Sequence, residues 1–248
     1  MQQPPPVQRV RIRYTKRSRL RFTSHRDISR AFERAVRRAA LPVSYSSGFN
    51  PHPRLSYAGA APTGAASEAE YMEVALAAPC DPETVRGRLD AAMPPGLDVV
   101  DAVTARTGAL ADRLQASSWT MLLGGVSTGA SERAVAAFLA ADAVQVSRMT
   151  KRGLRHFDAR ASVVSLRAGP APRAVSGEAS DGCAILAAVV RHGEPSVRPD
   201  DVLAGLREVA GLESSSAPIV QRLAQGPLDP RDGTVGDPLA ADRDTRDS

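Results

Sequence analysis

Residues 9–40 read RVRIRYTKRSRLRFTSHRDISRAFERAVRRAA, and the first strands and the first helix of the fold are predicted from this stretch. Apolar and basic side chains alternate from Arg9 to Tyr14 and again from Arg19 to Phe22, which is the period-2 pattern of half-buried β-strands. A three-residue loop between the two segments places their apolar side chains on one face, whereas a two-residue loop mixes the faces. The pattern therefore predicts a β-hairpin with arginines on its outer face.

The same stretch concentrates the positive charge of the chain. Between Arg9 and Arg38 lie eleven arginines and Lys16, against the two acids Asp27 and Glu33. The whole 248-residue chain has a net charge of only +5, so the remainder is acidic on balance. A local excess of this kind favours a surface that binds a polyanion, although a solvated outer face accounts for the same pattern.

Apolar spacing predicts a helix over residues 25–40, directly after the hairpin. Ser24 stands where its hydroxyl can cap the helix start, with Asp27 in the first turn, and Pro42 ends the pattern. Because the apolar positions face the core, the arginines of this helix face outward and continue the basic surface. The predicted nucleic-acid contacts are Arg9, Arg11, Arg13, Lys16, Arg19, Arg21, Arg26, Arg30 and Arg34, with Lys151 and Arg152 added from a second basic turn.

The order of predicted elements repeats once along the chain. Counting the hairpin as one arm, residues 8–105 follow the order β-α-β-β-α-β, and residues 118–225 follow it again without residue-level self-similarity. The sequence thus predicts an α+β protein of two tandem ferredoxin-like (βαββαβ) units with antiparallel sheets. Residues 106–117 are predicted to be a linker, and residues 226–248, which are nearly devoid of apolar side chains, a disordered tail.

Composition narrows the class further. At 43% hydrophobic and 4% aromatic residues, the chain can fill two modest cores with small aliphatic side chains. Cys80 and Cys183 are far apart and lie in no metal-ligand spacing, so no metal and no cofactor bound by this chain is predicted. The sequence has no bilayer-spanning run and no apolar signal segment, so we expect a cytoplasmic protein without a membrane partner.

The segment Gly48-Phe49-Asn50-Pro51-His52-Pro53 is a second candidate site. Its two prolines restrict the backbone, and Gly48 permits a positive φ. A loop stiffened in this way presents Phe49 for stacking and Asn50 or His52 for hydrogen bonding. The alternative is a rigid connector with Phe49 inserted into the core.

Polar residues outside this loop complete the candidate recognition site. If the loop folds back over the helix start, His52 comes near Ser24, His25 and Asp27, whereas Glu70 is expected to form an ion pair. Two histidines and one carboxylate are weak evidence for a metal site, so none is predicted. The sequence contains no motif of a known nucleophile, metallohydrolase or phosphate-binding loop, and no catalytic residue is predicted.

Several of these motifs together resemble one bacterial family. The residues concerned are Phe22–Ile28, Phe32–Ala35, Leu41-Pro42, Gly48–Pro53, Ser67-x-x-Glu70-Tyr71, Lys151–Gly153 and Asp158-x-Arg160. They are similar to the radical SAM-linked protein family, a domain family of unknown function encoded beside or fused to a radical SAM protein. The resemblance spans roughly residues 8–225. Ser18 stands where that family usually has a turn glycine, and Arg26 where it usually has leucine.

The resemblance implies a partner more than a reaction. A radical SAM protein would hold the S-adenosylmethionine and the iron–sulfur cluster, because a cluster requires a cysteine-rich site. We therefore expect a non-catalytic accessory protein that recognises RNA, either tRNA or rRNA, for that partner. Two alternatives stay open: an enzyme or ligand-binding domain with a pocket at His25, Asp27, Asn50 and His52, and an adaptor whose arginine face docks an acidic protein.

Overall fold

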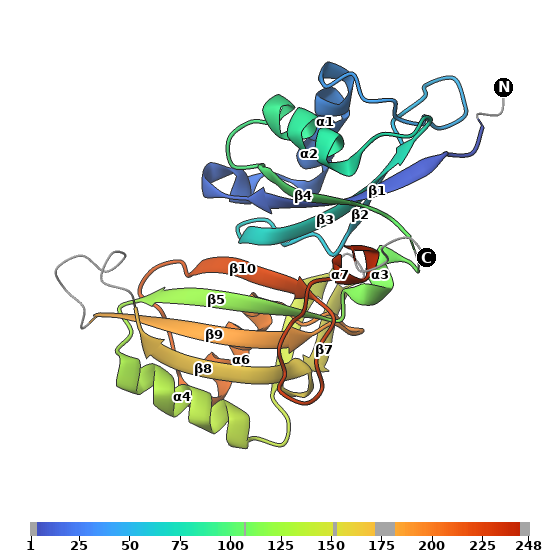
Figure 1. The fold of residues 1–248 in the computed structure, drawn as a ribbon. Helices are drawn as coiled ribbons and strands as arrows, with labels where there is room; N and C mark the ends of the chain where they lie inside the picture. The colour runs from blue at the N-terminus through green and yellow to red at the C-terminus, as the bar shows by residue number, and fades with distance from the viewer. Residues whose placement is uncertain (1–3, 107, 151–152, 172–181, 244–248) are drawn as a thin grey trace. The chain divides into compact units, whose positions relative to one another are not determined.

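The computed structural model describes residues 4–106, 108–150, 153–171 and 182–243, which form two compact units (Figure 1). Unit 1 comprises residues 1–114 and 237–248, and unit 2 comprises residues 115–236. Each unit combines helices with an antiparallel sheet, so the predicted α+β class is confirmed. Across the described ranges, no helix is both long enough and apolar enough to cross a membrane.

Unit 1 follows the predicted element order, with its main elements β1 (Gln8–Lys16), α1 (His25–Arg38), β2 (Leu55–Ala58), β3 (Ala66–Leu76), α2 (Pro82–Ala92) and β4 (Val99–Thr104). In its sheet β1 lies between β3 and β4, and β2 pairs with β3, all antiparallel. Helices α1 and α2 cover the same face of this sheet (Figure 1).

The alternation in β1 separates the two faces of the sheet. Val10, Ile12 and Tyr14 are buried in the core beneath α1 and α2. The register places Ile12 opposite Met72 of β3 and Ala102 of β4. Because successive side chains of a strand point to opposite faces, the arginines of β1 lie on the face away from these helices, as the pattern predicts.

The predicted hairpin is wrong. Residues Ser18–Phe22 form a short 3₁₀ helix, η1, and not a second strand. Both edges of β1 are already occupied by β3 and β4, so no edge is left for a local partner. Leu20 packs against the core while Phe22 is 60% exposed, and Ser18 takes a φ of +50° at the point where the turn was expected.

Helix α1 begins as predicted and ends on a strained residue. Ser24 Oγ accepts a hydrogen bond from the Asp27 amide at 3.3 Å, which confirms the N-cap. At the other end, the amides of Ala40 and Leu41 donate back to carbonyls of the last helical turn. This is the arrangement in which glycine is favoured in the left-handed position, yet Ala40 occupies it with a φ of +49°.

Replacing Ala40 by glycine should therefore stabilise the protein by about 0.5–1 kcal/mol, because relief of the left-handed strain exceeds the added entropy of the unfolded chain. Ala39 is the matched control, since its φ of −72° is ordinary and glycine there should destabilise by about 0.5–1 kcal/mol. Urea denaturation of both variants measures the difference. A similar loss of stability in both would contradict the assignment.

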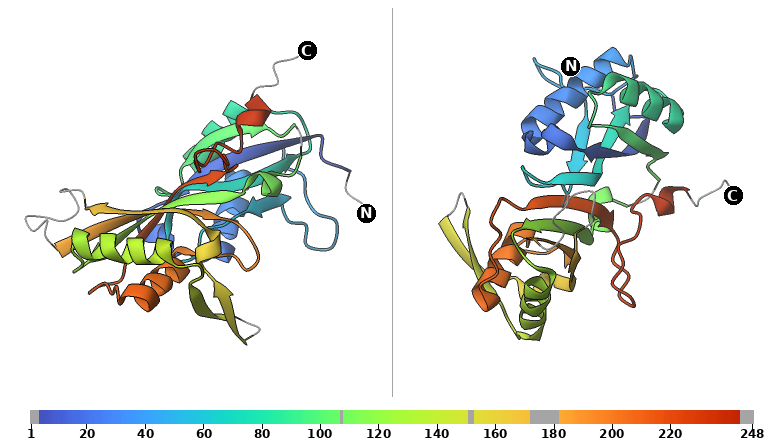
Figure 2. Two further views of the ribbon diagram at one scale, coloured as in Figure 1. Left: turned by 90° about the horizontal axis from the view of Figure 1, so that it is seen from below. Right: turned by 90° about the vertical axis from the view of Figure 1, so that its left-hand side faces the viewer.

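Unit 2 contains β5 (Ala116–Gly124), α4 (Thr128–Ala140), β6 (Gln145–Thr150), β7 (Gly153–Asp158), η2 (Arg160–Ser162), β8 (Val163–Pro170), β9 (Cys183–Arg191), α6 (Pro199–Ala210) and β10 (Ile219–Gly226). Its main sheet has the order β10-β5-β9-β8 (Figure 1). Strands β6 and β7 form a separate two-stranded sheet, drawn as a yellow hairpin in Figure 2. Strand β7 was not predicted, because the segment reads as a basic turn. Lys151 and Arg152, the predicted auxiliary contacts, lie outside the described residues.

The predicted linker and tail both differ from the structure. The short helix α3 (Leu110–Arg113) lies within the predicted linker, with Leu110 and Leu114 buried in unit 1, and β5 begins at Ala116. Near the C-terminus, Leu239 and the α7 helix (Ala240–Arg243) pack in unit 1, where Leu239 is fully buried. The prediction of disorder is thus wrong for these residues. It was made from composition, which does not reveal that Leu239 is buried in a core and that Asp242 accepts hydrogen bonds. Residues 244–248 lie outside the described residues.

Candidate functional site

Four arginines form a row on the exposed face of α1. This arginine stripe consists of Arg26, Arg30, Arg34 and Arg37, all of them exposed. Since an α-helix turns about 100° per residue, the four lie within about 80° of one another and opposite the side packed on the sheet. Successive members are about 4.5–6 Å apart along the axis. The sequence predicted the first three, and Arg37 is the member it omitted from the site.

The stripe has little acidic compensation. Arg30 Nη1 lies 3.7 Å from Asp27 Oδ1, with both side chains more than half exposed. Among the described residues, Arg26, Arg34 and Arg37 form no ion pair within 4.0 Å. Neighbouring like charges one turn apart destabilise a helix by a few tenths of a kcal/mol per pair. A bound polyanion would thus reduce the repulsion among these arginines more than the acidic residues of the protein do.

The basic residues ahead of α1 differ in exposure. Arg9 is half-exposed and lies 3.9 Å from Glu73. Arg19 is exposed in η1, and the Arg21 guanidinium lies 4.7 Å from the centre of the Phe22 ring. Both arginines lie in η1, which ends at Phe22, two residues before the Ser24 cap of α1.

Two predicted contacts are buried, and the expectation that they face solvent is wrong. Arg11 is 2% exposed, and its Nε donates to Glu73 at 2.9 Å. Lys16 is 1% exposed, and its ammonium donates to the carbonyl oxygens of Ala61 and Pro62 at 3.1 and 3.0 Å. Arg13 is half-buried on the same strand. Segments from other parts of the sequence contact these side chains, Gly108 and Asp242 at Arg11 and the chain at Ala61 and Pro62 at Lys16, and a local pattern does not reveal this.

The Gly48–Pro53 loop is held by its backbone and presents its side chains. The Ser46 amide donates to the His52 carbonyl at 2.8 Å, and the His52 amide donates to Ser46 Oγ at 3.0 Å. Gly48 has a φ of +126°, which only glycine adopts without strain. Phe49 is fully exposed, so the alternative that places it in the core is wrong. Asn50 and Pro51 are also exposed, whereas Pro53 is buried.

The loop contacts α1, but not at the predicted residues. His52 Nδ1 lies 3.8 Å from Oε2 of Glu33, with the His52 side chain 65% exposed. Within the described ranges, no hydrogen bond or ion pair joins any two of His25, Asp27, Asn50 and His52. Asp27 instead accepts from Ser24 Oγ at 2.7 Å. In the described part of the chain, the four residues of the predicted pocket thus make no polar contact with one another.

Tyr57 of β2 is a residue that the sequence argument missed. Its ring meets His25 edge-on at 4.9 Å between centroids and approaches Phe32 at 6.2 Å. Burial raises the pKa of Tyr57 to about 12, with Ser29 opposing the shift and the Glu33 carboxylate adding to it. The phenol is thus neutral at physiological pH, and it fixes the His25 ring against the core.

A polar groove of about 320 Å³ lies beside the loop. Its polar lining residues are Arg9, Ser46, His52, Arg54, Ser56 and Glu73. Glu70 is not among them: it is 1% exposed, and its carboxylate accepts from the Ala61 amide at 3.2 Å, so it fixes the chain at Ala61. Over the described part of the chain, no group of three His, Cys, Asp or Glu side chains is placed to hold a metal ion.

Replacing His52 by alanine should change the free energy of unfolding by about 0.5 kcal/mol or less, because the ring is largely exposed and backbone hydrogen bonds hold the loop. Its contact with Glu33 is screened by solvent and adds little. Urea denaturation tests this. A loss above about 1 kcal/mol would show that the ring has a structural role that the contacts do not account for.

Comparison with known proteins places the chain in a family. The family model described as "Uncharacterized protein conserved in bacteria (DUF2344)" matches residues 9–199. No curated protein matches the chain. The matched range contains the arginine stripe and the Gly48–Pro53 loop and covers most of the sequence. The chain therefore belongs to the DUF2344 family of bacterial proteins.

Proposed function

We propose that this protein is a non-catalytic RNA-recognition protein, in which the arginine stripe contacts phosphates and the Gly48–Pro53 loop contacts a base. The observation that carries the proposal is the stripe, four exposed arginines one turn apart with a single partial ion pair. Phosphate contacts of this kind supply most of the affinity for a nucleic acid and make it depend on salt.

The loop adds a contact of a different chemical kind. Phe49 is a fully exposed aromatic ring on a backbone restricted by two prolines, so little conformational entropy is lost when it stacks on a base. Unpaired RNA bases are splayed out and available for such stacking. The His52 ring, 3.8 Å from Glu33, lies beside α1 and next to the stripe. One RNA strand could thus contact both.

The class of substrate and the partner are inferred from the strand order of unit 1 and from the motif resemblance. The strand order of unit 1 is similar to that of a ferredoxin-like unit, an architecture found among RNA-binding modules, and this supports the proposal by analogy only. The motif resemblance to the radical SAM-linked protein family adds that the RNA, a tRNA or rRNA, is presented to a radical SAM protein. That partner would supply the S-adenosylmethionine and the iron–sulfur cluster.

The groove beside the loop favours a second candidate function. Two arginines and His52 line it together with Glu73, a combination that suits a small anionic ligand. A ligand-binding domain of this kind would lose affinity on substitution of Arg54 and would respond weakly to salt. An RNA-binding surface would instead depend on the stripe.

Replacing Phe49 by alanine should weaken the binding of a 12-nucleotide single-stranded RNA by about 5- to 150-fold, the equivalent of about 1–3 kcal/mol for one stacked base. Phe49→Trp is the matched control, because it preserves a stacking surface and should keep most of the affinity. Fluorescence anisotropy at fixed salt measures both. Equal affinity in the alanine variant and the wild type would remove the loop from the proposed interface.

A further inference from the structure

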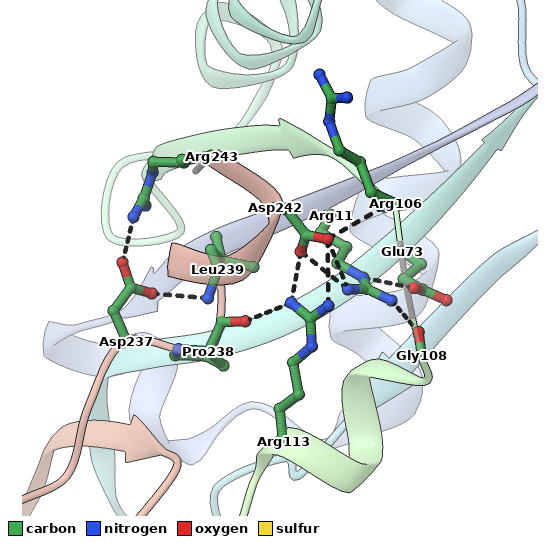
Figure 3. A network of polar contacts seen from close by, with 10 residues as sticks. All are labelled: Arg11, Glu73, Arg106, Gly108, Arg113, Asp237, Pro238, Leu239, Asp242 and Arg243. Atoms are coloured by element: carbon green, nitrogen blue, oxygen red, sulfur yellow. Dashed lines mark hydrogen bonds and ion pairs between the residues drawn. The ribbon is translucent and has the colours of Figure 1, made fainter. Parts of the chain in front are cut away.

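A buried carboxylate from the C-terminal segment lies on the face of the unit 1 sheet away from α1 and α2 (Figure 3). Arg11 Nη1 donates to the two oxygens of Asp242 at 2.8 and 3.1 Å. Arg113 donates to them at 2.7 and 3.2 Å, and the backbone amide of Arg106 adds a fifth hydrogen bond at 3.1 Å. Two guanidinium groups and one amide thus converge on a single carboxylate whose side chain is 0% exposed.

The receptor half of this arrangement is held independently of the carboxylate. Arg11 Nε donates to Glu73 at 2.9 Å, and its Nη2 donates to the carbonyl of Gly108. Arg113 extends from α3. Among the described residues, the site without Asp242 would hold two guanidinium groups and the carboxylate of Glu73, so its net charge would be positive. An anion is therefore required to complete it.

An apolar anchor lies one helical turn before the carboxylate. Leu239 is fully buried in a cluster formed by Ala69, Tyr71, Val103, Leu110 and Leu114. The Pro238 carbonyl accepts from Arg113 Nη1 at 2.8 Å. Leu239 and Asp242 are three residues apart, a spacing that places both on one side of a helical turn. The segment thus docks through one apolar and one acidic side chain.

We propose that unit 1 carries a docking site for a short acidic segment of the type Leu-x-x-Asp, that residues 237–243 fill this site in cis, and that a protein partner presenting the same two side chains competes for it. This site is separate from the RNA surface, which lies on α1.

The composition of the segment supports its role as a ligand. A helix of four residues has almost no stability of its own, so α7 forms because the site holds it. Short helical segments that dock through a few spaced anchors are a common mode of peptide recognition.

The test uses the full chain with the cis ligand disabled by Leu239→Ala and Asp242→Ala. The probe is a capped synthetic peptide of residues 236–243, GDPLAADR, titrated while the backbone amide resonance of Arg106 is followed by NMR. We expect the double variant to bind the peptide at least tenfold more tightly than the wild type, whose own segment competes. The same peptide carrying Asp242→Asn should bind at least tenfold more weakly, as should the double variant with Arg113→Gln added.

Equal binding of the two peptides, or equal binding by wild type and double variant, would overturn the proposal. If the double variant does not fold, the single variant Asp242→Asn allows the same titration, because Leu239 still packs while the carboxylate is lost. It should then bind the wild-type peptide more tightly than the wild-type chain does. The absence of any such gain would also overturn the proposal.

Discussion

Replacing Asp242 by alanine is expected to lower the free energy of unfolding by about 3 kcal/mol, because it leaves the buried guanidinium of Arg11 and the partly buried guanidinium of Arg113 without their shared counter-charge. For a protein of this size the melting temperature should fall by about 10 °C. The five hydrogen bonds to this carboxylate carry the expectation, since all five are lost together. Deleting residues 237–248 should cost more, because the buried Leu239 is removed as well.

Asp232 provides the matched control for this effect. It is also an acid of the C-terminal stretch, but it is exposed and accepts from the amide and hydroxyl of Thr234. Asp232→Ala should cost about 0.5–1 kcal/mol, the loss of a turn hydrogen bond. Differential scanning calorimetry of both variants separates the two outcomes. Equal and small shifts would show that the C-terminal segment contributes nothing to unit 1.

The stabilisation by Asp242 should also depend on pH with a defined sign. Burial alone would raise the pKa of this carboxyl, but hydrogen bonds from Arg113, Arg106 and Arg11 outweigh it and hold the pKa below the ordinary value of 3.8. A lowered pKa in the folded state means that the stabilisation is complete above the unfolded value and is lost as the pH falls through the folded one. The stability difference between wild type and Asp242→Asn should therefore be constant from about pH 5 to 8 and shrink below about pH 4.

Local signals in the sequence were sufficient to place α1, whereas η1, α3 and α7 of unit 1 were not predicted. The start of α1 depends on residues within one turn, and the expected hydroxyl cap from Ser24 is present. The alternation of β1 was also read correctly. Its partners were not, because strand pairing is decided by residues about 60 and 90 positions away, such as those of β3 and β4.

The candidate site likewise combines features that the local sequence predicts with features that depend on distant residues. The outward face of α1 follows from helical periodicity, which is local, whereas the prolines around Phe49 left open whether its ring is exposed or inserted into the core. The burial of Arg11 depends on Asp242, 231 positions along the chain, in a stretch whose composition indicates disorder. Glu33 and Tyr57, which contact the two predicted histidines, carried no motif that could have identified them.

Replacing the arginine stripe by glutamine at Arg26, Arg30, Arg34 and Arg37 should weaken the binding of single-stranded RNA by about 100-fold or more while leaving the fold intact. All four side chains are exposed and lie opposite the packed side of α1, so their charges are not needed by the core. Removal of four neighbouring like charges should leave stability unchanged or raise it by a few tenths of a kcal/mol per pair.

Unit 2 offers a control with the same change of net charge. Arg133, Arg167, Arg191 and Arg207 are exposed there, and their replacement by glutamine removes four positive charges from a different part of the chain. Binding that depends on net charge alone should fall equally in the two variants. Binding through the stripe should fall only when α1 is changed.

The most direct test is the salt dependence of RNA affinity in wild type, the stripe variant and the unit 2 variant. A log–log plot of the association constant against salt concentration has a slope of about −0.7 for each phosphate neutralised on a single strand. If each arginine of the stripe contacts one phosphate, the slope should become shallower by about 3 in the stripe variant and stay unchanged in the unit 2 variant. An identical slope in wild type and the stripe variant would contradict the assignment of α1 as the RNA-binding surface.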